Sequence, residues 1–357
     1  MMKQFPLFLL LLLLGSVFCL PMIAKKKAPQ GAYLLATDFV KANGQTDVAD
    51  ALQQLIDSNP NRTIYFPDGT YLLSHTLRTP ADPTKAVHLV LANFAVLKAA
   101  DSWPEDGGAL VSLGGEFPYN SIYINGSNYG IEGGIFDGSD KADGIYIESG
   151  RETRINHVSI KHVRCGIHIL RGANAGSSDA DVVDVNIVGN KSPESVGVLI
   201  EGYDNTFTNM RIAGCHVGVW SKSGGNSFRN IHPLYTHRDK DYYESSIGFL
   251  IERSSNWMNF CYSDQYATGF KLSKDVCCTL TDCYVYWYSG KVPFQTAIAC
   301  EGKLNSVVRN LRIGFQPECP KATVLKAKLG GNGVLEYTSM RPHDLSDEDV
   351  SEAYFRK

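Results

Sequence analysis

Apolar and polar residues alternate with a period of two in a short phrase that recurs from residue 144 onwards. Each copy begins with glycine and continues with alternating apolar residues. The copies are GIYIE (144–148), GIHIL (166–170), GVLIE (197–201), GVWSK (218–222), GFLIE (248–252) and GFKLS (269–273), with a variant lacking glycine, TAIAC, at 296–300. Alternation of this kind is typical of a strand with one buried face. The phrase therefore predicts one short strand in each repeat.

A second recurring phrase lies between the first ones and carries a polar residue near its middle. These polar positions are Asn156, Asp184, Asn209, Asn230, Asn259, Asp282 and Asn310. The two phrases together repeat about every 20 residues, a length typical of stacked solenoid coils. Equivalent side chains of neighbouring coils lie about 4.8 Å apart. We therefore expect the Asn and Asp side chains to hydrogen bond along the stack, and Cys261 and Cys283 to lie on adjacent coils.

The start of the chain predicts a cap over the first coil. Residues 38–74 contain an amphipathic segment with Asp47 as its N-cap and Asn59-Pro60 at its end, followed by the strand–turn–strand sequence TIYFPDGTY. The apolar face of the segment consists of Val48, Leu52, Leu55 and Ile56. A β-sandwich is the alternative fold, but its hairpin signals, such as Asn-Gly between strands, are sparse.

This opening resembles the pectate-lyase-like superfamily of right-handed parallel β-helix proteins. The matching residues are Asp38-Phe39, Gly44-Gln45-Thr46-Asp47 and Tyr65-Phe66-Pro67-Asp68-Gly69-Thr70-Tyr71, and with the coils the resemblance spans residues 31 to 315. It implies an all-β fold: a single-stranded right-handed parallel β-helix of about ten coils with an N-terminal capping helix. We place this domain at residues 31–340, with the cap at 38–74 and an acidic C-terminal tail at 341–357.

The resemblance does not supply a catalytic residue. Members of the superfamily include pectin and alginate lyases, polygalacturonases, other glycoside hydrolases and phage tailspikes. The polygalacturonase motifs (Asn-Thr-Asp, Asp-Asp and Gly-His-Gly) are absent, as is the Val-Trp-Ile-Asp-His motif of pectate lyases. Residues 133–138 (GGIFDG) resemble a coil that is largely structural in such hydrolases. Function must therefore be argued from the site.

Charge and the N-terminal segment narrow the partners and the location. The formal net charge is -3 and there is no basic block, which argues against a nucleic-acid partner. The apolar run at 5–14 predicts a signal peptide within residues 1–24, and it is interrupted too soon for a transmembrane segment. We therefore expect a secreted or periplasmic protein, with an outer-surface lipoprotein anchored through Cys19 as the alternative. The remaining cysteines show no zinc pattern and are expected to be small buried residues.

Two long connections between coils predict a site on one side of the solenoid. They lie between Asn230 and Gly248 and between Asp282 and Thr296, with the segment 261–268 between them. Loops on a rigid scaffold commonly carry chemistry, and glycoside hydrolysis requires two carboxyl groups. The catalytic candidates are Asp264, Asp241 and Glu244, with His232 or His237 as a proton shuttle. The substrate-binding candidates are Arg238, Tyr242, Tyr262, Tyr266, Tyr286, Trp287 and His216, with His162 and Arg164 extending a subsite.

Each of these residues also has a purely structural interpretation. Residues 239–244 form a charge run typical of a solvated loop, Asp264 is placed to bond a turn, and the aromatic residues are spaced for a stacked ladder. A separate insertion at 171–184 contains Asp179, Asp181 and Asp184, which are candidates for calcium binding. No other metal or cofactor is expected.

Three functions fit these observations. The first, by a small margin, is an exported glycoside hydrolase that cleaves a polysaccharide with paired carboxylates. The second is a polysaccharide lyase that acts on a uronate-containing glycan by β-elimination. The third is a non-catalytic glycan-binding or adhesive protein, and a homotrimer is compatible with it.

Overall fold

A computed structural model of the protein describes residues 33–105, 107–115, 129–148, 150–171, 177–237, 242–288, 295–319, 322–339 and 345–346. The chain divides into two units at residues 32 and 33, and every described residue belongs to the second unit. The predicted signal peptide, Cys19 and nearly all of the predicted acidic tail therefore lie outside the described residues. Within these residues, no helix combines the length and the apolar character that a membrane crossing requires.

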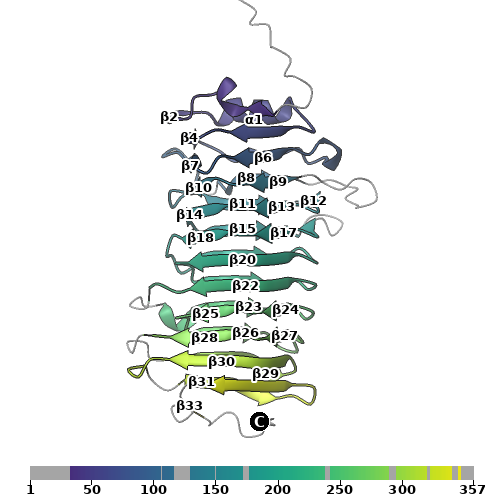
Figure 1. Ribbon diagram of the computed structural model, residues 1–357, viewed down its shortest axis with the longest axis vertical. Coiled ribbons are helices and arrows are strands. Elements are labelled where there is room, and N and C mark those ends of the chain that lie inside the picture. Colours follow the sequence, from purple (N-terminus) through teal and green to yellow (C-terminus); the bar gives the residue numbers. More distant parts are fainter. Residues whose placement is uncertain are drawn as a thin grey trace, which may run out of the picture. The chain divides into compact units, whose positions relative to one another are not determined.

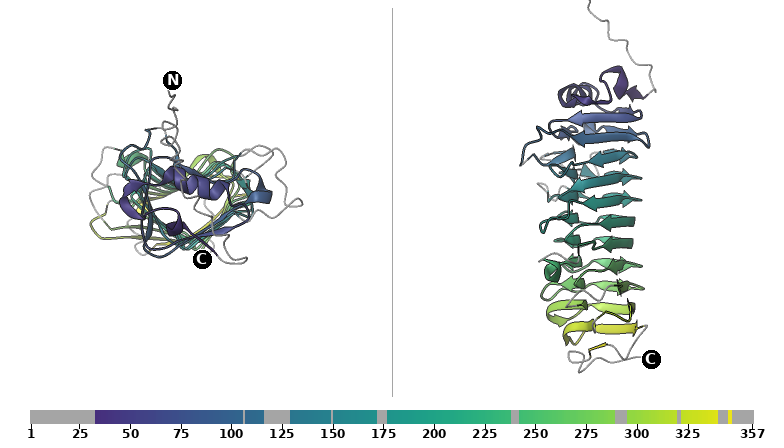
Figure 2. Two further views of the ribbon diagram at one scale, coloured as in Figure 1. Left: turned by 90° about the horizontal axis from the view of Figure 1, so that it is seen from above. Right: turned by 90° about the vertical axis from the view of Figure 1, so that its left-hand side faces the viewer.

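The described residues wind into stacked coils whose strand pairings are all parallel (Figures 1 and 2). One wall is an eleven-stranded sheet that contains the strands of all the glycine phrases. Its strands are β5 (Leu77–Arg78), β8 (Ala109–Leu113), β11 (Asp143–Ile147), β15 (Cys165–Ile169), β19 (Val196–Ile200), β21 (Val217–Ser221), β23 (Ile247–Ile251), β26 (Thr268–Leu272), β29 (Thr296–Leu304), β31 (Ala322–Leu329) and β33 (Leu345–Ser346). The predicted right-handed parallel β-helix is confirmed.

The other walls form a twenty-stranded sheet, which bends at the second recurring phrase. Its strands are β1 (Leu34–Leu35), β2 (Asn43–Asp47), β3 (Thr63–Phe66), β4 (Gly69–Leu73), β6 (His88–Leu91), β7 (Ala95–Ala99), β9 (Gly130–Glu132), β10 (Ile135–Asp137), β13 (Arg154–Asn156), β14 (Ser159–Val163), β17 (Asp181–Val183), β18 (Asn186–Gly189), β20 (Thr206–Ala213), β22 (Ser227–Leu234), β24 (Trp257–Asn259), β25 (Tyr262–Asp264), β27 (Thr279–Thr281), β28 (Tyr284–Trp287), β30 (Val307–Phe315) and β32 (Val334–Ser339). A small third sheet pairs β12 (Gly150–Arg151) with β16 (Ser177–Ser178).

The capping helix α1 (Ala49–Asp57) lies across the N-terminal end of the coils, in purple in Figure 2. Its predicted apolar face is buried, and the carboxylate of Asp47 accepts the backbone N–H of Ala49 at 3.0 Å. The 3-10 turns are η1 (Ala36–Asp38), η2 (Pro83–Lys85) and η4 (Tyr243–Ser245). The helix covers apolar side chains that the first coil would otherwise expose to solvent.

The glycine of each strand phrase is required by close packing between the walls. A Cβ atom on Gly144 would lie 2.3 Å from the carbonyl oxygen of Gly166 and 2.6 Å from the side chain of Ile160. The same conflict recurs one coil later, where a Cβ atom on Gly166 would lie 2.5 Å from the carbonyl oxygen of Gly197. In these coils only glycine fits at the corner, whereas the corner holds Leu110 in the coil before and Ala297 and Val324 in later coils.

The polar residues of the second phrase form the predicted hydrogen-bonded stack at the bend of the twenty-stranded sheet. Asn230 donates to Asn209 at 2.9 Å, Asn209 donates to Asp184 at 3.1 Å, and Asn310 donates to Asp282 at 2.6 Å. All five have the left-handed backbone that Asn and Asp tolerate best.

At two of the predicted positions the prediction was off by one residue. The bend falls on His157 instead of Asn156 and on Phe260 instead of Asn259, because these following residues adopt the left-handed backbone. The predicted neighbours Cys261 and Cys283 come directly after the bend in adjacent coils, and their thiols lie close together. The described cysteines are free thiols.

Candidate functional site

The outward face of the eleven-stranded sheet carries a column of side chains from the middle of the glycine phrases. From the N-terminal coil onwards the column reads Ser112, Tyr146, His168, Leu199, Trp220, Leu250 and Lys271. A second column, formed by the residue after each strand, includes Glu148, Glu201, Lys222 and Glu252. Aromatic, basic and acidic groups therefore share one wall of the coil.

Asp143 organises the first part of this wall. It is the first residue of β11 and is only 3% exposed. Its carboxylate accepts hydrogen bonds from the Tyr146 hydroxyl at 2.5 Å, from Arg164 Nη2 at 3.0 Å and from the backbone N–H of Cys165 at 2.9 Å. A buried carboxylate needs such partners to stay charged. Asp143 therefore fixes the positions of a phenol and a guanidinium on two neighbouring coils.

The environment keeps the Tyr146 hydroxyl protonated. Burial and then the negative charge of Asp143 raise its pKa, since both disfavour a phenolate. Its ring lies edge-to-face against the imidazole of His168 on the next coil, with ring centroids 5.3 Å apart. Tyr146 is thus a proton donor beside a histidine.

His168 is held by a carboxylate and kept neutral by burial. Its Nε2 lies 3.2 Å from an oxygen of Glu201, whose other oxygen accepts from Lys222 Nζ at 3.1 Å. Burial lowers the pKa of His168, and the charge of Glu201 only partly opposes this. Partial burial would raise the pKa of Glu201, but hydrogen bonds from Lys222 and His168 outweigh it and lower the pKa. An ionised carboxylate therefore orients a neutral imidazole, whose lone pair is on Nδ1 when Nε2–H points to Glu201.

Cations and aromatic rings continue the wall on both sides of this group. The Lys222 ammonium lies 4.4 Å from the ring centroid of Trp220, and the Trp220 indole donates to Glu252 at 2.9 Å. Arg164 is 59% exposed at its side chain, although one of its nitrogens bonds to Asp143. Its guanidinium lies beside the Tyr146 hydroxyl, because both groups donate to the same carboxylate oxygen of Asp143. The wall therefore places a neutral base, a protonated phenol and two cations within four coils.

The structure brings together one part of the predicted site on the twenty-stranded sheet. His232, Tyr262 and Asp264 lie on β22 and β25, with His232 Nε2 3.5 Å from an oxygen of Asp264. The rings of His232 and Tyr262 stack with centroids 4.1 Å apart. Tyr286, on the neighbouring strand β28, is paired with Asp264. Asp264 is 8% exposed and accepts a hydrogen bond from Gln265 at 3.0 Å.

Three of the predicted sugar-stacking residues do not fit that role. The ring of Tyr262 is covered by His232 on one face and by Tyr284 on the other, with the second pair 4.9 Å apart. Tyr266 and Trp287 are fully buried, and the Trp287 indole donates to the backbone carbonyl of Tyr266 at 2.7 Å. The prediction that Tyr266 and Trp287 bind substrate is wrong because both side chains belong to the core.

The other predicted residues that the structure describes lie near a buried aromatic cluster. This cluster consists of Tyr235, Tyr243, Tyr266 and Ala267, with Tyr242 packed against it. His216 is 8% exposed, its Nε2 lies 3.1 Å from the Ser245 hydroxyl, and its ring meets Tyr242 edge-on. Glu244 is exposed on η4 and His237 is half-buried after β22. Arg238 and Asp241 lie outside the described residues.

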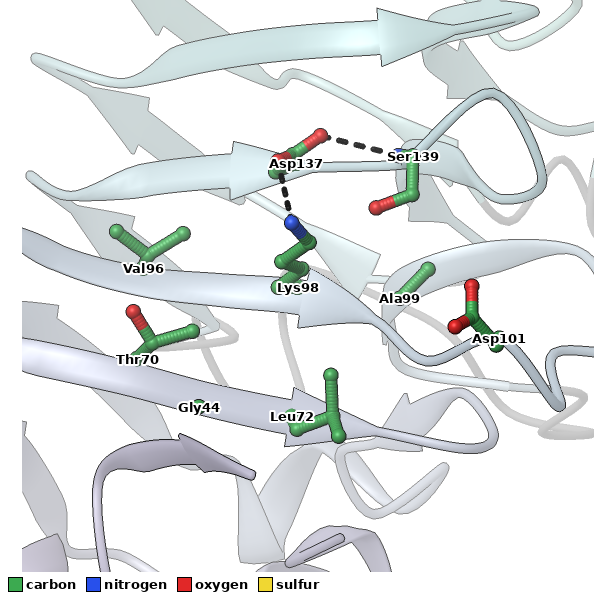
Figure 3. A pocket seen from close by; sticks show the side chains of 9 residues that line it. All are labelled: Gly44, Thr70, Leu72, Val96, Lys98, Ala99, Asp101, Asp137 and Ser139. Carbon is green, nitrogen blue, oxygen red and sulfur yellow. Dashed lines mark hydrogen bonds and ion pairs between the residues drawn. The ribbon is translucent and has the colours of Figure 1, made fainter. Parts of the chain in front are cut away.

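A groove of about 660 Å³ near the N-terminal coils contains the Asp137 side chain of the GGIFDG segment (Figure 3). Asp137 accepts from the backbone N–H of Ser139 at 3.0 Å and contacts His162 Nδ1 at 2.9 Å and Lys98 Nζ at 3.7 Å. Burial would raise its pKa, but the bond to His162 and the nearby cations outweigh it and lower the pKa. Because its partners come from three coils, Asp137 locks a turn and the coils next to it.

The calcium hypothesis receives no support within the described residues, where no group of three or more His, Cys, Asp or Glu side chains is placed to hold a metal ion. Asp184 instead accepts a hydrogen bond from Asn209 and lies 3.4 Å from His157.

Sequence reasoning missed most of the wall on the eleven-stranded sheet. Of its residues only Arg164 was singled out, and the others are Asp143, Tyr146, His168, Glu201 and Lys222. A signal was nevertheless present: three glycine phrases end in glutamate, and the middle position of the six phrases varies between Tyr, His, Leu, Trp and Lys.

Comparisons with known proteins agree with this architecture. The solved structures that resemble the chain include Geobacillus virus E2 ORF18 (16% identity, TM-score 0.52, covering 86% of this chain and 62% of that one). They also include the tailspike protein of E. coli bacteriophage HK620 (12%, TM-score 0.58, 86% and 72%) and the alginate lyase of Paenibacillus sp. str. FPU-7 (15%, TM-score 0.51, 81% and 95%). The chain thus spans less than two thirds of the viral ORF18 protein.

At these identities the likeness shows the fold alone. The sequence matches none of the curated proteins. The family model described as "Rhamnogalacturonase A/epimerase, pectate lyase-like" matches residues 36–231, more than half of the chain. The match covers the cap, the first four glycine phrases and the part of the wall that carries Tyr146, His168 and Glu201. The chain belongs to the rhamnogalacturonase A/epimerase, pectate lyase-like family.

Proposed function

We propose that the protein is a polysaccharide-acting enzyme that removes the C5 proton of a uronic acid residue, and that it cleaves the chain by β-elimination. The observation that carries this proposal is the Tyr146–His168–Glu201 group on the eleven-stranded sheet, with Arg164 beside it. The family description and the alginate lyase among the similar structures fit a polysaccharide substrate.

The proposed step uses the protonation states of the two reacting side chains. The neutral His168 imidazole takes the C5 proton, and the electrons of that bond form the C4–C5 double bond while the C4–O4 bond breaks. The departing O4 oxygen takes a proton from the Tyr146 hydroxyl, which turns towards it from Asp143. The guanidinium of Arg164 neutralises the uronate carboxylate, which makes the C5 proton more acidic. Exchange with water then restores both side chains.

A glycoside hydrolase would require a different pair of groups. It uses two carboxyl groups, one of which carries a proton. The lowered pKa of Glu201 makes it ionised at neutral pH, so it does not donate a proton there. The hydrolase is kept as the second candidate because Asp264 is nearly buried and lies close to His232 on the other sheet. Catalytic roles for Asp264, Asp241, Glu244, His232 and His237 stay predictions of that candidate.

The test is a panel of acidic and neutral polysaccharides, with products followed both by ultraviolet absorbance and by new reducing ends. Elimination produces both signals, whereas hydrolysis produces reducing ends alone. Tyr146→Phe and His168→Asn should each remove activity, and Tyr65→Phe on β3 of the other sheet is the matched control. Loss of activity in Asp264→Asn, with full activity in His168→Asn, would favour the hydrolase. Binding without any turnover would favour the adhesive function.

Location and assembly are proposals of the same kind. We expect secretion or export to the periplasm, and assembly as a homotrimer is testable by mass in solution.

His216 and Tyr242 lie at the start of β21 and on the loop before β23, next to the wall that carries the proposed site. They are therefore the predicted substrate-binding residues best placed to extend it.

A further inference from the structure

A second groove lies on the twenty-stranded sheet towards the C-terminal coils and is separate from the wall that carries Tyr146 and His168. Its volume is about 760 Å³. The residues that line it are Phe260, Asp282, Tyr284, Asn310, Arg312, Thr338 and Ser339. Phe260 lies at the bend of one coil, and the other lining residues come from the next three coils towards the C-terminus.

Phe260 is the unusual residue of this groove. It occupies a bend position that Asn or Asp fills in five coils, and it has the same left-handed backbone, with φ of 54°. A bulky side chain in that conformation is strained, and it cannot hydrogen bond to the Asn230 amide on one side or the Asp282 carboxylate on the other. The side-chain stack is therefore interrupted between Asn230 and Asp282. Despite this cost the ring is 54% exposed, so packing in the core does not explain it.

The groups around the Phe260 ring match the chemistry of a sugar. Arg312 contributes a fork of N–H donors, and among the described residues no carboxylate forms an ion pair with it. Asp282 accepts one hydrogen bond, from Asn310, and the described residues donate none to its other carboxylate oxygen. An exposed aromatic ring beside such donors and acceptors suits a pyranose, whose C–H face is apolar and whose rim carries hydroxyl groups.

We propose that this groove binds a segment of polysaccharide without cleaving it, with a sugar ring on Phe260 and sugar hydroxyls on Arg312 and Asp282. This inference rests on the proposed function in one respect: the bound polysaccharide is the same chain that the eleven-stranded sheet is proposed to cleave. The groove would hold a long substrate near the enzyme while the eleven-stranded sheet acts on it. Short oligosaccharides would not need the groove.

The experiment is affinity electrophoresis of the full chain through gels that contain polygalacturonate, alginate or dextran. The variants are Phe260→Asn and Arg312→Gln, and the matched control is Phe94→Asn, another exposed phenylalanine at a turn. Loss of one aromatic contact should weaken binding about tenfold. Turnover of short oligosaccharides should stay unchanged. Phe260→Asn should also raise the melting temperature, because asparagine tolerates the left-handed backbone and completes the stack.

Several outcomes would overturn the inference. Unchanged retention of Phe260→Asn overturns it, as does a wild-type protein that none of the three gels retards. A solution mass that falls on Phe260→Asn would assign the groove to a second copy of the chain instead. The two proposals fail separately: His168→Asn should lose turnover but keep retention. A wild type that is retained without turning over any glycan would refute the proposed function and leave the groove in place.

Discussion

Glu201→Gln is the substitution that separates an orienting role for Glu201 from a purely structural one. In the folded protein its carboxylate joins His168 on one coil to Lys222 on another, at 3.2 and 3.1 Å. Glutamine has nearly the same shape but no charge, and its amide nitrogen cannot accept a hydrogen bond. The variant therefore keeps one of the two contacts and loses the ionic part of both.

The expected cost in stability is small. The Glu201 side chain is 32% exposed, so solvent screens its ion pairs, and we expect a loss of about 0.5–1 kcal/mol in the free energy of unfolding. The expected cost in activity is larger, because the imidazole is no longer held in one tautomer and orientation. A positioned general base is worth about 100- to 10,000-fold, and we expect kcat/KM to fall about 100-fold.

The pH profile carries the specific signature. Burial lowers the pKa of His168, and the negative charge of Glu201 opposes that shift. Removing the charge lets the pKa fall further, so His168 stays neutral to lower pH. The acid limb of kcat/KM should therefore move to lower pH in Glu201→Gln. A merely structural glutamate would not move this limb.

The assay is the initial rate of ultraviolet absorbance increase across the acid range, on the polysaccharide that the panel identifies. Glu301→Gln is the matched control. Glu301 lies on β29, in the column of residues that also contains Glu201, and it pairs with Lys271 at 3.5 Å. An unchanged rate, or an acid limb that stays in place or moves to higher pH, would refute the role assigned to Glu201.

Three further predictions follow from the contacts described above. Asp143→Asn removes the charge that holds the Tyr146 hydroxyl and the Arg164 guanidinium in place, so kcat/KM should fall; unchanged kinetics contradict the assignment. Asn226→Ala removes the acceptor of the buried backbone N–H and side-chain amide N–H of Asn205, and urea denaturation should show a loss of about 2–4 kcal/mol. The pKa of Asp137 is lowered in the folded protein, so its ionised carboxylate stabilises the fold above the unfolded pKa, and this stabilisation is lost as the pH falls through the folded pKa. Asp137→Asn should therefore flatten the acid part of a profile of melting temperature against pH.

The sequence was sufficient for the fold because two local constraints recur in six successive coils, from Gly144 to Gly269. The glycine positions are fixed by close contact between the walls, as at Gly144, and the apolar alternation follows from one buried face. The polar stack was also predictable, although Asn156 and Asn259 were one residue out. Nothing in a single sequence shows that His157 and Phe260 take the left-handed backbone next to an asparagine.

The site was less predictable, partly for a reason that strand geometry explains. Successive residues of a strand face opposite sides, so Tyr286 and Trp287 cannot both face solvent, and Trp287 is the buried one. Gln265 adopts the left-handed backbone, with φ of 65°, and the following Tyr266 is buried in the core.

The contacts that define the proposed site all join different coils. Asp143 bonds Arg164 across one coil step, His168 reaches Glu201 across the next, and Lys222 reaches back to Glu201 from a third. Each of these pairs is separated by 21 to 33 residues in sequence, so only the register of the stack brings them together. That register is set by the glycine corners and the asparagine bends, which allow little adjustment. The scaffold residues thus preorganise a phenol, an imidazole and a guanidinium on one wall, and an enzyme needs such preorganisation more than it needs a mobile loop.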